Sequence, residues 1–456
     1  MTKKTNETKT VLETHAETIF RAGLERVNSR LLLEQVLTLN GNILTIKTEA
    51  DELSIDLTHF KKIKLIGFGK AAAQMASGLC SILDKHIVEG VVVVKDQTEV
   101  KLPQGLELIT GTHPVPDEKS VYAGKRLLEF CNLCGPNELV LGVISGGASA
   151  LVEMPAAGLT LEDLKKTTQQ LLSSGVTIQE MNCIRKHLSD VKGGRLAREI
   201  FPAASVNFIL SDVIGDDLSI IGSGPTVADK TTFLDAMKIV EKYKLTQKLP
   251  AAVVSHLKEA KDETPKTGDF TLSGTRNILV GTNRQALAAA RKKAQELGYE
   301  TLILSHEIQG EASTVAHKFF NFSKELEKNP RMKKPACILA GGETTVTLQG
   351  SGKGGRNQEM ALAYVCCLMD QTEHALEQVF LSASTDGSDG PTDATGAFAT
   401  LSILEKAKKL GLDPEAFLDN NDSYNFFAKT GGHLKTGPTE TNVCDLQVLL
   451  IGDNKT

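Results

Sequence analysis

The stretch AGGETTVTLQGSGKGGRNQEM, residues 340–360, combines the features that predict the fold of this chain. It starts at the end of an apolar run, turns at Gly341-Gly342, and passes through a second glycine run, 350–355, into a helix-like sequence that begins at Arg356. A strand, a glycine turn and a helix in this order are typical of an α/β protein. A cation in the first turn opposes the helix dipole, so Arg356 indicates that an anion lies beside it.

The same order recurs along the rest of the chain. Apolar segments that end in glycine-rich or acidic turns occur at 63–66, 139–144, 206–210, 336–340 and 379–383. Apolar strands that alternate with helices predict parallel sheets covered by helices on both faces, which gives Rossmann-like three-layer α/β/α domains. Because such sheets bind ligands at the carboxyl ends of their strands, we expect the turns to carry the functional residues.

The length of 456 residues exceeds what one ordinary core can hold, so we expect two domains. The stretch 262–275 is polar and rich in glycine, proline and threonine, and it is the candidate border between them. We therefore predict an N-terminal domain of residues 1–262 and a C-terminal domain of residues 263–442. The final apolar segment, within 443–456, could return to the N-terminal domain and complete it.

Composition excludes several classes of function. The 41% hydrophobic and 23% charged content is that of a soluble globular protein, and a net charge of −5 argues against nucleic-acid binding. No segment approaches the ~18 consecutive apolar residues of a membrane span, and the polar N-terminus is unlike a secretory signal. The eight cysteines fall mostly in apolar stretches, which favours reduced, buried thiols in a cytoplasmic protein. A metal or redox role for Cys131 and Cys134 is the alternative.

The turn GFGK, residues 67–70, has the strand-turn-helix context of a dinucleotide-binding loop. It lacks the third glycine, and the acidic residue expected ~20 positions later has only Glu89 and Asp96 as weak candidates. Lys70 opposes the helix dipole as Arg356 does, which favours a lysine that contacts phosphate or takes part in catalysis. A structural turn with a solvated lysine is the alternative.

Two segments of the first half offer further contacts to an anion. The turn SGGAS, residues 145–149, follows an apolar strand and presents N–H groups and hydroxyls to a phosphate or a substrate carboxylate. The sequence has no G-x-S-x-G elbow, which weighs against a hydrolase, and a structural tight turn is the alternative. In segment 182–197 we expect one or two cations to face a ligand and the others to lie on a solvated helix face. These cations are Arg185, Lys186, Lys192 and Arg195.

Carboxylates follow three of the apolar segments, at Asp212, Glu343 and Asp386. Mg²⁺ takes one or two protein oxygens and keeps water and phosphate oxygens as its other ligands, so these acids suit a magnesium site. The acidic loop 384–393 resembles half an EF-hand, but its register fails, and helix capping is the alternative role for the acids of such loops. Anion cradles, cations that oppose helix dipoles and strand-end acids are together the parts that phosphoryl transfer needs.

With these segments assembled, the chain resembles the glycerate 2-kinases, the family whose C-terminal part is called MOFRL. The resemblance covers about residues 13–451 and rests on an ordered series of long motifs. They are GFGKAAAQM (67–75), THPVPDEKS (112–120), VISGGASAL (143–151), NCIRKHLSDVKGGRLA (182–197), LSDVIGDDLSIIGSGPTVAD (210–229), GTNRQAL (281–287), AGGETTVTLQGSGKGGRNQEMALA (340–363), STDGSDGPTDATGAF (384–398) and TGPTETNVCDL (436–446).

The resemblance implies transfer of the ATP γ-phosphate to the 2-hydroxyl of D-glycerate, with Mg²⁺, to give 2-phosphoglycerate and ADP. It also implies two α/β domains with the active site in the cleft between them. The proposed catalytic cations of the family match Lys70 and Arg356, and its acidic positions match Asp212, Glu343 and Asp386. The chain departs from the family pattern at Glu440 and Cys444, and these departures put only the local turn geometry in doubt.

These inferences give a set of expected site residues. The catalytic residues are Lys70, Arg356 and Asp386. The nucleotide-binding residues are Gly67, Gly69, Gly350, Gly352, Gly354 and Gly355. The substrate-binding residues are Ser145, Gly146, Gly147, Arg185 and Lys192. The Mg²⁺ ligands are Asp212, Glu343 and Asp386. Which glycine loop binds the nucleotide, and which carboxylate acts as base, stays open at this stage.

Two other functions compete with the kinase. An NAD(P)H-dependent hydroxypyruvate reductase would use the turn at 67–70, and a non-catalytic sugar-phosphate-binding protein would need the anion contacts alone. The expected partners are ATP and D-glycerate, with no nucleic acid and no membrane. The residues alone do not separate a 2-phosphoglycerate from a 3-phosphoglycerate product, and they leave the oligomeric state open, a homodimer included.

Overall fold

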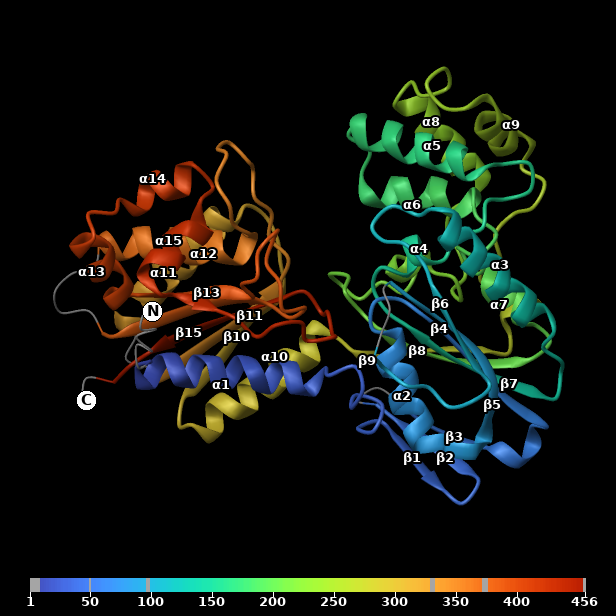
Figure 1. The fold of residues 1–456 in the computed structure, drawn as a ribbon, viewed down its shortest axis with the longest axis horizontal. Helices are drawn as coiled ribbons and strands as arrows, with labels where there is room; N and C mark the ends of the chain where they lie inside the picture. Colours follow the sequence, from blue (N-terminus) through green and yellow to red (C-terminus); the bar gives the residue numbers. More distant parts are fainter. Residues whose placement is uncertain (1–8, 49–50, 96–98, 329–332, 371–375, 454–456) are drawn as a thin grey trace. The chain divides into compact units, whose positions relative to one another are not determined.

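The computed structural model describes residues 9–48, 51–95, 99–328, 333–370 and 376–453. The chain divides into two compact units, one of residues 29–280 and one of residues 1–28 with 281–456 (Figure 1). We name them the Lys70 unit and the Arg356 unit, after the candidate residue that each contains. Each unit is built on a six-stranded sheet covered by helices.

The sheet of the Lys70 unit has the strand order β6-β5-β4-β7-β8-β9. Its strands are β4 (Lys62–Phe68), β5 (Ile87–Val94), β6 (Leu106–Thr110), β7 (Glu138–Ile144), β8 (Ala204–Leu210) and β9 (Thr275–Gly281). The pairings of β4 with β5 and β7, of β5 with β6 and of β7 with β8 are parallel, as predicted. The chain builds outward from β4 to β6 and then continues with β7 on the other side of β4. The carboxyl ends of β4 and β7 therefore flank the switch point where such sheets bind ligands.

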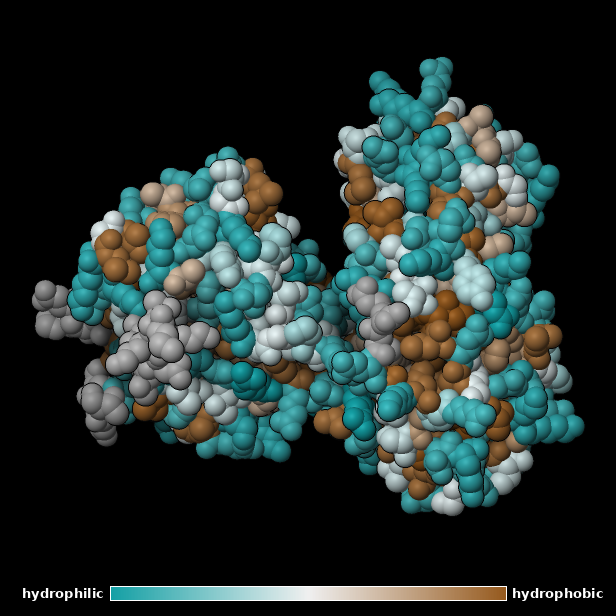
Figure 2. Space-filling model, viewed as in Figure 1, coloured by the Kyte–Doolittle hydropathy of each residue, from teal (hydrophilic) through white to brown (hydrophobic). Residues whose placement is uncertain are grey.

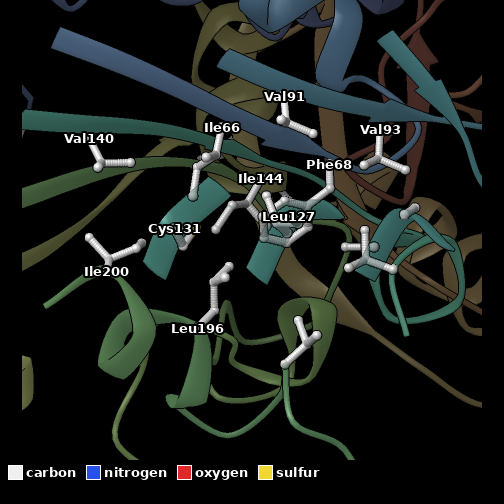
Figure 3. Packing of buried hydrophobic residues seen from close by; sticks show 14 of the residues in the cluster. Ile66, Phe68, Val91, Val93, Leu127, Cys131, Val140, Ile144, Leu196 and Ile200 are labelled. Atoms are coloured by element: carbon white, nitrogen blue, oxygen red, sulfur yellow. The ribbon is translucent and has the colours of Figure 1, made fainter. Parts of the chain in front are cut away.

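Alternating side chains of this sheet supply two hydrophobic faces. Ile66, Phe68, Val91 and Val93 point to one face and pack against α3 (Glu118–Asn132) and α7 (Arg195–Ile200), as Figure 3 shows. On the sheet's other side, α2 (Ala72–Leu83) contacts the strands and also β1 of a small antiparallel sheet. The strands of that small sheet are β1 (Leu37–Asn40), β2 (Ile43–Lys47) and β3 (Glu52–Asp56). Its first two strands form a hairpin that turns at Gly41-Asn42.

A helical lobe with its own hydrophobic core belongs to the Lys70 unit (Figure 1). It consists of α5 (Leu161–Ser173), α6 (Ile178–His187), α8 (Phe233–Lys242) and α9 (Ala251–Glu259). Reciprocal capping boxes start three of these helices, at Thr160, Thr177 and Thr232. Each threonine is followed three residues later by an acid, so the sequence itself specifies where these helices begin.

The sheet of the Arg356 unit is mixed, with the order β10-β11-β15-β12-β13-β14. Its strands are β10 (Glu300–Ile308), β11 (Ala336–Gly342), β12 (Gln378–Ser384), β13 (Gly396–Thr400), β14 (His433–Leu434) and β15 (Asp445–Ile451). The strands β10 and β11 are parallel, but β15 runs antiparallel to both β11 and β12. The expectation of a parallel sheet therefore holds only in part here. Because β15 runs the other way, its first residue, Asp445, lies at the carboxyl ends of β11 and β12.

Helices cover the two faces of this second sheet. On one face α12 (Arg356–Cys367) packs beside α11 (Ala312–Lys328), and Tyr364 of α12 stacks on Phe380 of β12. The helices α1 (Val11–Arg26) and α10 (Asn283–Glu296) pack on each other and contact strands of the same sheet. Gly23 permits that close approach, because a side chain there would press on Leu446 and on the Ala286 carbonyl. Three shorter helices complete the unit: α13 (Leu401–Lys409), α14 (Pro414–Asp419) and α15 (Ser423–Thr430).

The division of the chain differs from the predicted boundaries of 1–262 and 263–442. Helix α1 packs in the Arg356 unit although it is the first element of the chain. The stretch 262–275 is not a border, because Asp262 pairs with Arg195 and Arg198 and β9 then adds to the first sheet. The final segment, within 443–456, does not complete the N-terminal domain, because β15 is a central strand of the second sheet.

The described residues contain no helix that is long and apolar enough to cross a membrane. In Figure 2 hydrophilic side chains cover much of the visible face of each unit, with hydrophobic patches between them. All eight cysteines are buried and unbridged, and burial raises the pKa of both Cys131 and Cys134. This agrees with the prediction of reduced, buried thiols.

Candidate active site

Two loops meet at the switch point of the Lys70 unit. Strand β4 ends at Phe68, and Gly69 then adopts a φ of +126°, a conformation that favours glycine. The backbone N–H of Lys70 donates to the Gly146 carbonyl at 2.9 Å, and the N–H of Ala71 donates to Ser145 Oγ at 3.0 Å. The turn at 67–70 and the turn at 145–149 are therefore joined into one surface, at the sheet edge predicted to bind ligands.

The glycines of the second loop bring side chains close together. A Cβ atom on Gly146 would collide with the carboxylate of Asp212. A Cβ on Gly147 would lie 3.1 Å from both His113 Cδ2 and Lys70 Cγ. Lys70, His113 and Asp212 thus surround the Gly146-Gly147 turn. The structure brings the predicted residues Lys70 and Asp212 to that turn and adds His113, which the sequence marked only as part of the motif THPVPDEKS.

The charges of this group favour an anionic ligand. Lys70 is exposed, and its ammonium has no hydrogen bond or ion pair with any residue that the structure describes. Burial lowers the pKa of His113 to about 4, and the nearby charges of Lys70 and Lys95 act in the same direction. His113 is therefore neutral at pH 7 and does not repel Lys70. A neutral imidazole also keeps one ring nitrogen as a hydrogen-bond acceptor.

The cations of segment 182–197 have separate roles. The Arg185 guanidinium donates to Ser149 Oγ at 2.6 Å, so it supports the 145–149 loop. The side chain of Lys192 is only 1% exposed and pairs with the buried Glu153, and burial lowers the pKa of Lys192 to about 8. The other two are also buried in internal ion pairs, Lys186 with Asp229 and Arg195 with Asp262, so the prediction that the remaining cations lie on a solvated helix face is wrong. These contacts make Arg185 a support of the 145–149 loop and Lys192 a partner in a buried ion pair, and substrate binding by either residue stays a prediction.

Arg356 is the first residue of α12, and two carboxylates hold it. Its Nε and Nη2 atoms donate to Asp445 at 2.6 and 2.9 Å in a bidentate pair, and Nη1 donates to Glu343 at 2.5 Å. Burial disfavours its charge, but the hydrogen bonds and charge of Asp445, helped by Glu343, outweigh burial and raise the pKa of Arg356. Burial raises the pKa of Asp445, and the hydrogen bonds and charge of Arg356 oppose this rise.

The anion predicted beside the start of α12 is the protein's own. The buried carboxylate of Asp389 accepts the backbone N–H groups of Asn357 at 3.0 Å and Gln358 at 2.9 Å, in the first turn of the helix. Asp389 takes the position that a bound phosphate would otherwise hold at a helix N-terminus. Neither Asp389 nor Asp445 was expected from the sequence, because only the tertiary structure brings them to Arg356.

The glycine run 350–355 also has internal partners. The N–H groups of Gly350, Ser351, Gly352 and Lys353 donate to Asn420, Asn421 and Asp422. Side chains at the glycines of this run would collide with that segment or with Ser423 and Asp389. Close packing is thus enough to explain why glycine occupies these positions. Nucleotide binding by Gly350, Gly352, Gly354 and Gly355 stays a prediction.

Asp386 lies just beyond β12, at the same sheet edge as Asp445. Its Oδ1 atom accepts from Ser384 Oγ at 2.8 Å and from the backbone N–H of Ser388 at 3.0 Å. Across the described ranges no group of three or more His, Cys, Asp or Glu side chains is placed to hold a metal. A magnesium site that draws one or two carboxylates from the protein remains compatible with this arrangement.

Comparison with known protein families identifies two regions of the chain. Residues 15–258 match a domain of unknown function, DUF4147, and residues 336–445 match the MOFRL family. The match at 336–445 includes the strand β11, the glycine run, α12 and the first residue of β15.

Relatives with names also match over most of the chain. A D-glycerate 2-kinase of Thermotoga maritima is 40% identical over 410 residues, which cover 89% of this chain and 93% of the relative. A glycerate kinase of Rattus norvegicus is 35% identical and covers 96% of this chain and 93% of its own length. An Agrobacterium vitis protein with the provisional name hydroxypyruvate reductase is 40% identical over 85% of this chain and 87% of its own.

Two solved structures also match over nearly the whole chain. The crystal structure of a Thermotoga maritima glycerate kinase superposes with a TM-score of 0.86 at 37% identity, over 96% of this chain and 99% of that chain. A Pyrococcus horikoshii protein superposes with a TM-score of 0.84 at 35% identity, over 98% of this chain and all of that one (100%).

Proposed function

The chain belongs to the glycerate 2-kinase family with a MOFRL domain, and from this membership we propose that it phosphorylates the 2-hydroxyl of D-glycerate with ATP. The products are 2-phosphoglycerate and ADP. The observation that carries the proposal is the group of Lys70, His113 and Asp212 around the Gly146-Gly147 turn, at the switch point of a parallel sheet. This group offers a cation that has no ion pair among the described residues, together with backbone N–H groups and a carboxylate, and phosphoryl transfer needs such groups.

In the Lys70 unit the lysine neutralises charge on the transferring phosphoryl group. Its ammonium has no protein partner in the described ranges, so it can bind a phosphate oxygen without first breaking an ion pair. Gly146 and Gly147 let a substrate oxygen approach the backbone, and Arg185 holds the loop through Ser149. Asp212 would hold Mg²⁺ here. When bound there, Mg²⁺ would neutralise negative charge on the phosphate groups.

In the Arg356 unit the guanidinium is fixed in advance. Asp445 accepts hydrogen bonds from two donors of Arg356. The guanidinium therefore presents a preoriented charge at the sheet edge where Asp386 also lies. We assign Asp386 to the substrate hydroxyl or to Mg²⁺, and Glu343 to control of the charge of Arg356. Catalysis by both Lys70 and Arg356 follows the roles that the family resemblance implies.

The reductase alternative has one observation in its favour, the provisional name of the Agrobacterium vitis relative. A nicotinamide site would need an acid near the ribose after the turn at 67–70. Glu89 instead pairs with Lys62 at 3.3 Å and with Lys64 at 3.5 Å, near the amino ends of β4 and β5. It therefore lies toward the opposite end of the strands from Gly69. The other candidate, Asp96, lies outside the described residues.

One pair of assays tests the proposal. Purified protein is mixed with D-glycerate, ATP and Mg²⁺ while ADP is followed, and separately with hydroxypyruvate and NADH while absorbance is followed. We expect ADP release that depends on D-glycerate, and nuclear magnetic resonance of the product identifies the 2-phosphate. NADH consumption without ADP release would establish the reductase instead, and binding without turnover would indicate a sensor. The proposal includes a cytoplasmic enzyme with ATP and D-glycerate as its small-molecule partners.

A further inference from the structure

A cavity of about 360 Å³ lies in the Lys70 unit between helix α5 and the loop that precedes α3. The loop contributes Pro114, Val115 and Pro116, and the helix contributes residues of 164–172. Glu153 and Arg185 also line it. The volume is that of a small-molecule site. The candidate catalytic group lies nearby in sequence, because Pro114 follows His113 directly.

The lining is apolar with a surplus of positive charge. Leu164, Leu172, Leu188 and the proline-valine loop supply the apolar walls. Arg185 and Lys165 supply two cations, and no described residue forms a hydrogen bond or ion pair with the Lys165 ammonium. The only lining acid is Glu153, which already pairs with the buried Lys192. A ligand with one anionic group and an apolar body matches this lining.

Two further features of the lining favour a bound ligand. Thr167 lines the cavity and is only 1% exposed. Its Oγ atom has no hydrogen-bond partner among the described residues. Leaving a buried hydroxyl unpaired costs about 1–3 kcal/mol. At the same cavity two large apolar residues are exposed, Val115 by 59% and Leu172 by 65%. A ligand that entered between them would cover this apolar surface and could satisfy the hydroxyl.

We propose that this cavity is a second ligand site, which binds a small organic carboxylate with an apolar body and thereby inhibits turnover. The carboxylate pairs with Lys165 and Arg185, and the apolar body packs on Leu164, Leu172 and Val115. Arg185 also donates to Ser149 at 2.6 Å, and the loop of Ser149 accepts the Lys70 N–H through Gly146. A ligand that draws on Arg185 therefore weakens the support of the catalytic loop. Binding itself does not depend on the proposed kinase activity.

Calorimetric titration with 3-phenylpropionate, without ATP, tests the binding. Two probes serve as controls: 3-phenylpropanol has the same body without the charge, and propionate has the charge without the ring. We expect saturable binding of 3-phenylpropionate that is at least roughly fivefold tighter than that of either control, about 1 kcal/mol of added affinity. Saturating D-glycerate should leave it unchanged. Equal binding of the three probes, or displacement by D-glycerate, would overturn the proposal of a separate site.

Neighbouring lysines of α5 give a matched pair of variants. Lys165→Met removes the lining cation, whereas Lys166→Met removes an exposed cation that pairs with Glu162 outside the lining. We expect Lys165→Met to weaken 3-phenylpropionate binding roughly fivefold and Lys166→Met to leave it unchanged. Thr168→Trp, which fills the cavity, should abolish binding with an unaltered circular dichroism spectrum. Equal effects of the two lysine variants would refute the site, as would undiminished binding by a folded Thr168→Trp protein.

Turnover measured with 3-phenylpropionate tests the inhibition separately. We expect the probe to lower kcat in the wild type and in Lys166→Met at the same concentrations, and to require roughly fivefold more in Lys165→Met. Saturable binding without any loss of turnover would remove the inhibitory role. A protein without kinase activity but with the expected binding would contradict the proposed function alone.

Discussion

Lys70 and Arg356 hold matching places in their two units, and their surroundings differ sharply. Each comes from a glycine-rich turn beside a buried strand and lies at a helix N-terminus. Lys70 is exposed and its ammonium has no ion pair within the described part of the chain. Arg356 is held by Asp445 and Glu343, and Asp389 caps its helix. The two local sequences gave the same expectation, yet one cation is unpaired and the other is fixed.

The difference indicates a division of work between the two cations. A flexible lysine can follow a charge that moves during the reaction, because its ammonium is a point charge with no preferred direction. A guanidinium in a bidentate pair is preorganised, so it stabilises charge at one place with little reorganisation. The fixed cation is also surrounded by carboxylates, so less of its charge reaches an incoming phosphate.

Removal of either cation should have the largest effect on turnover. We expect Lys70→Ala and Arg356→Ala each to lower kcat by about 10³-fold or more, by analogy with an arginine that stabilises transferring phosphate. Lys70→Arg should keep more activity than Arg356→Lys, because only Arg356 depends on its fork of donors. Steady-state kinetics measures these values. Lys166→Ala, at an exposed lysine of α5, is the control, and near-normal turnover in Lys70→Ala or Arg356→Ala would remove that residue from catalysis.

Loss of the partner of Arg356 should chiefly affect stability. Asp445→Ala leaves the guanidinium without its bidentate carboxylate in a largely buried position, which costs about 3 kcal/mol of unfolding free energy. Urea unfolding followed by circular dichroism measures this. Asp393→Ala breaks the exposed pair with Lys435 and should cost much less. Equal losses in the two variants would show that the pair of Arg356 and Asp445 is no stronger than a surface contact.

Acid should destabilise both units through a partly buried histidine in each. Burial lowers the pKa of His113 and of His433 from 6.5 to about 4. Between these values the unfolded chain binds a proton that the folded chain does not, so stability falls as pH falls from about 6.5 towards 4. His113→Gln and His433→Gln should each flatten this dependence in urea unfolding at pH 5 and pH 7, and only His113→Gln should also alter kcat. Unchanged pH dependence in both variants would contradict the burial effect.

The smallest effect is expected at Glu343. Its side chain is 45% exposed and it partly neutralises Arg356, so Glu343→Gln should lower the KM for ATP about two- to fivefold with kcat little changed. Initial rates at fixed free Mg²⁺ measure this, with Glu325→Gln, at an exposed position of α11, as the comparison. A raised Mg²⁺ requirement would instead assign Glu343 to the metal, as the sequence first indicated.

Local pattern predicted most elements correctly. The helix predicted to begin at Arg356 is α12, and the apolar segments predicted at 63–66 and 139–144 lie in the strands β4 and β7. The capping boxes at Thr160 and Thr177 show why: the start of a helix is specified within four residues. The parallel order of the first sheet was also predicted, because its strands are apolar on both faces and alternate with helices.

Domain membership and strand direction could not be predicted in the same way. The apolar face of α1 would suit either unit, and its packing on α10 is a contact between segments more than 250 residues apart. An apolar strand such as β15 has the same sequence pattern whether it runs parallel or antiparallel to its neighbours. The predicted border at 262–275 failed for a related reason, since polar residues there form ion pairs within one unit.

The sequence by itself determined the strands, the glycine turns and the two cations at helix N-termini, because each depends on residues within one turn or strand of one another. Only the tertiary structure decided that Asp445 and Asp389 neutralise the Arg356 region, while Lys70 pairs with no residue in the described part of the chain. The reason is the antiparallel direction of β15, which carries Asp445 to the carboxyl ends of β11 and β12. That direction depends on strand pairing between distant segments. The free energy of such pairing cannot be inferred from a local sequence pattern.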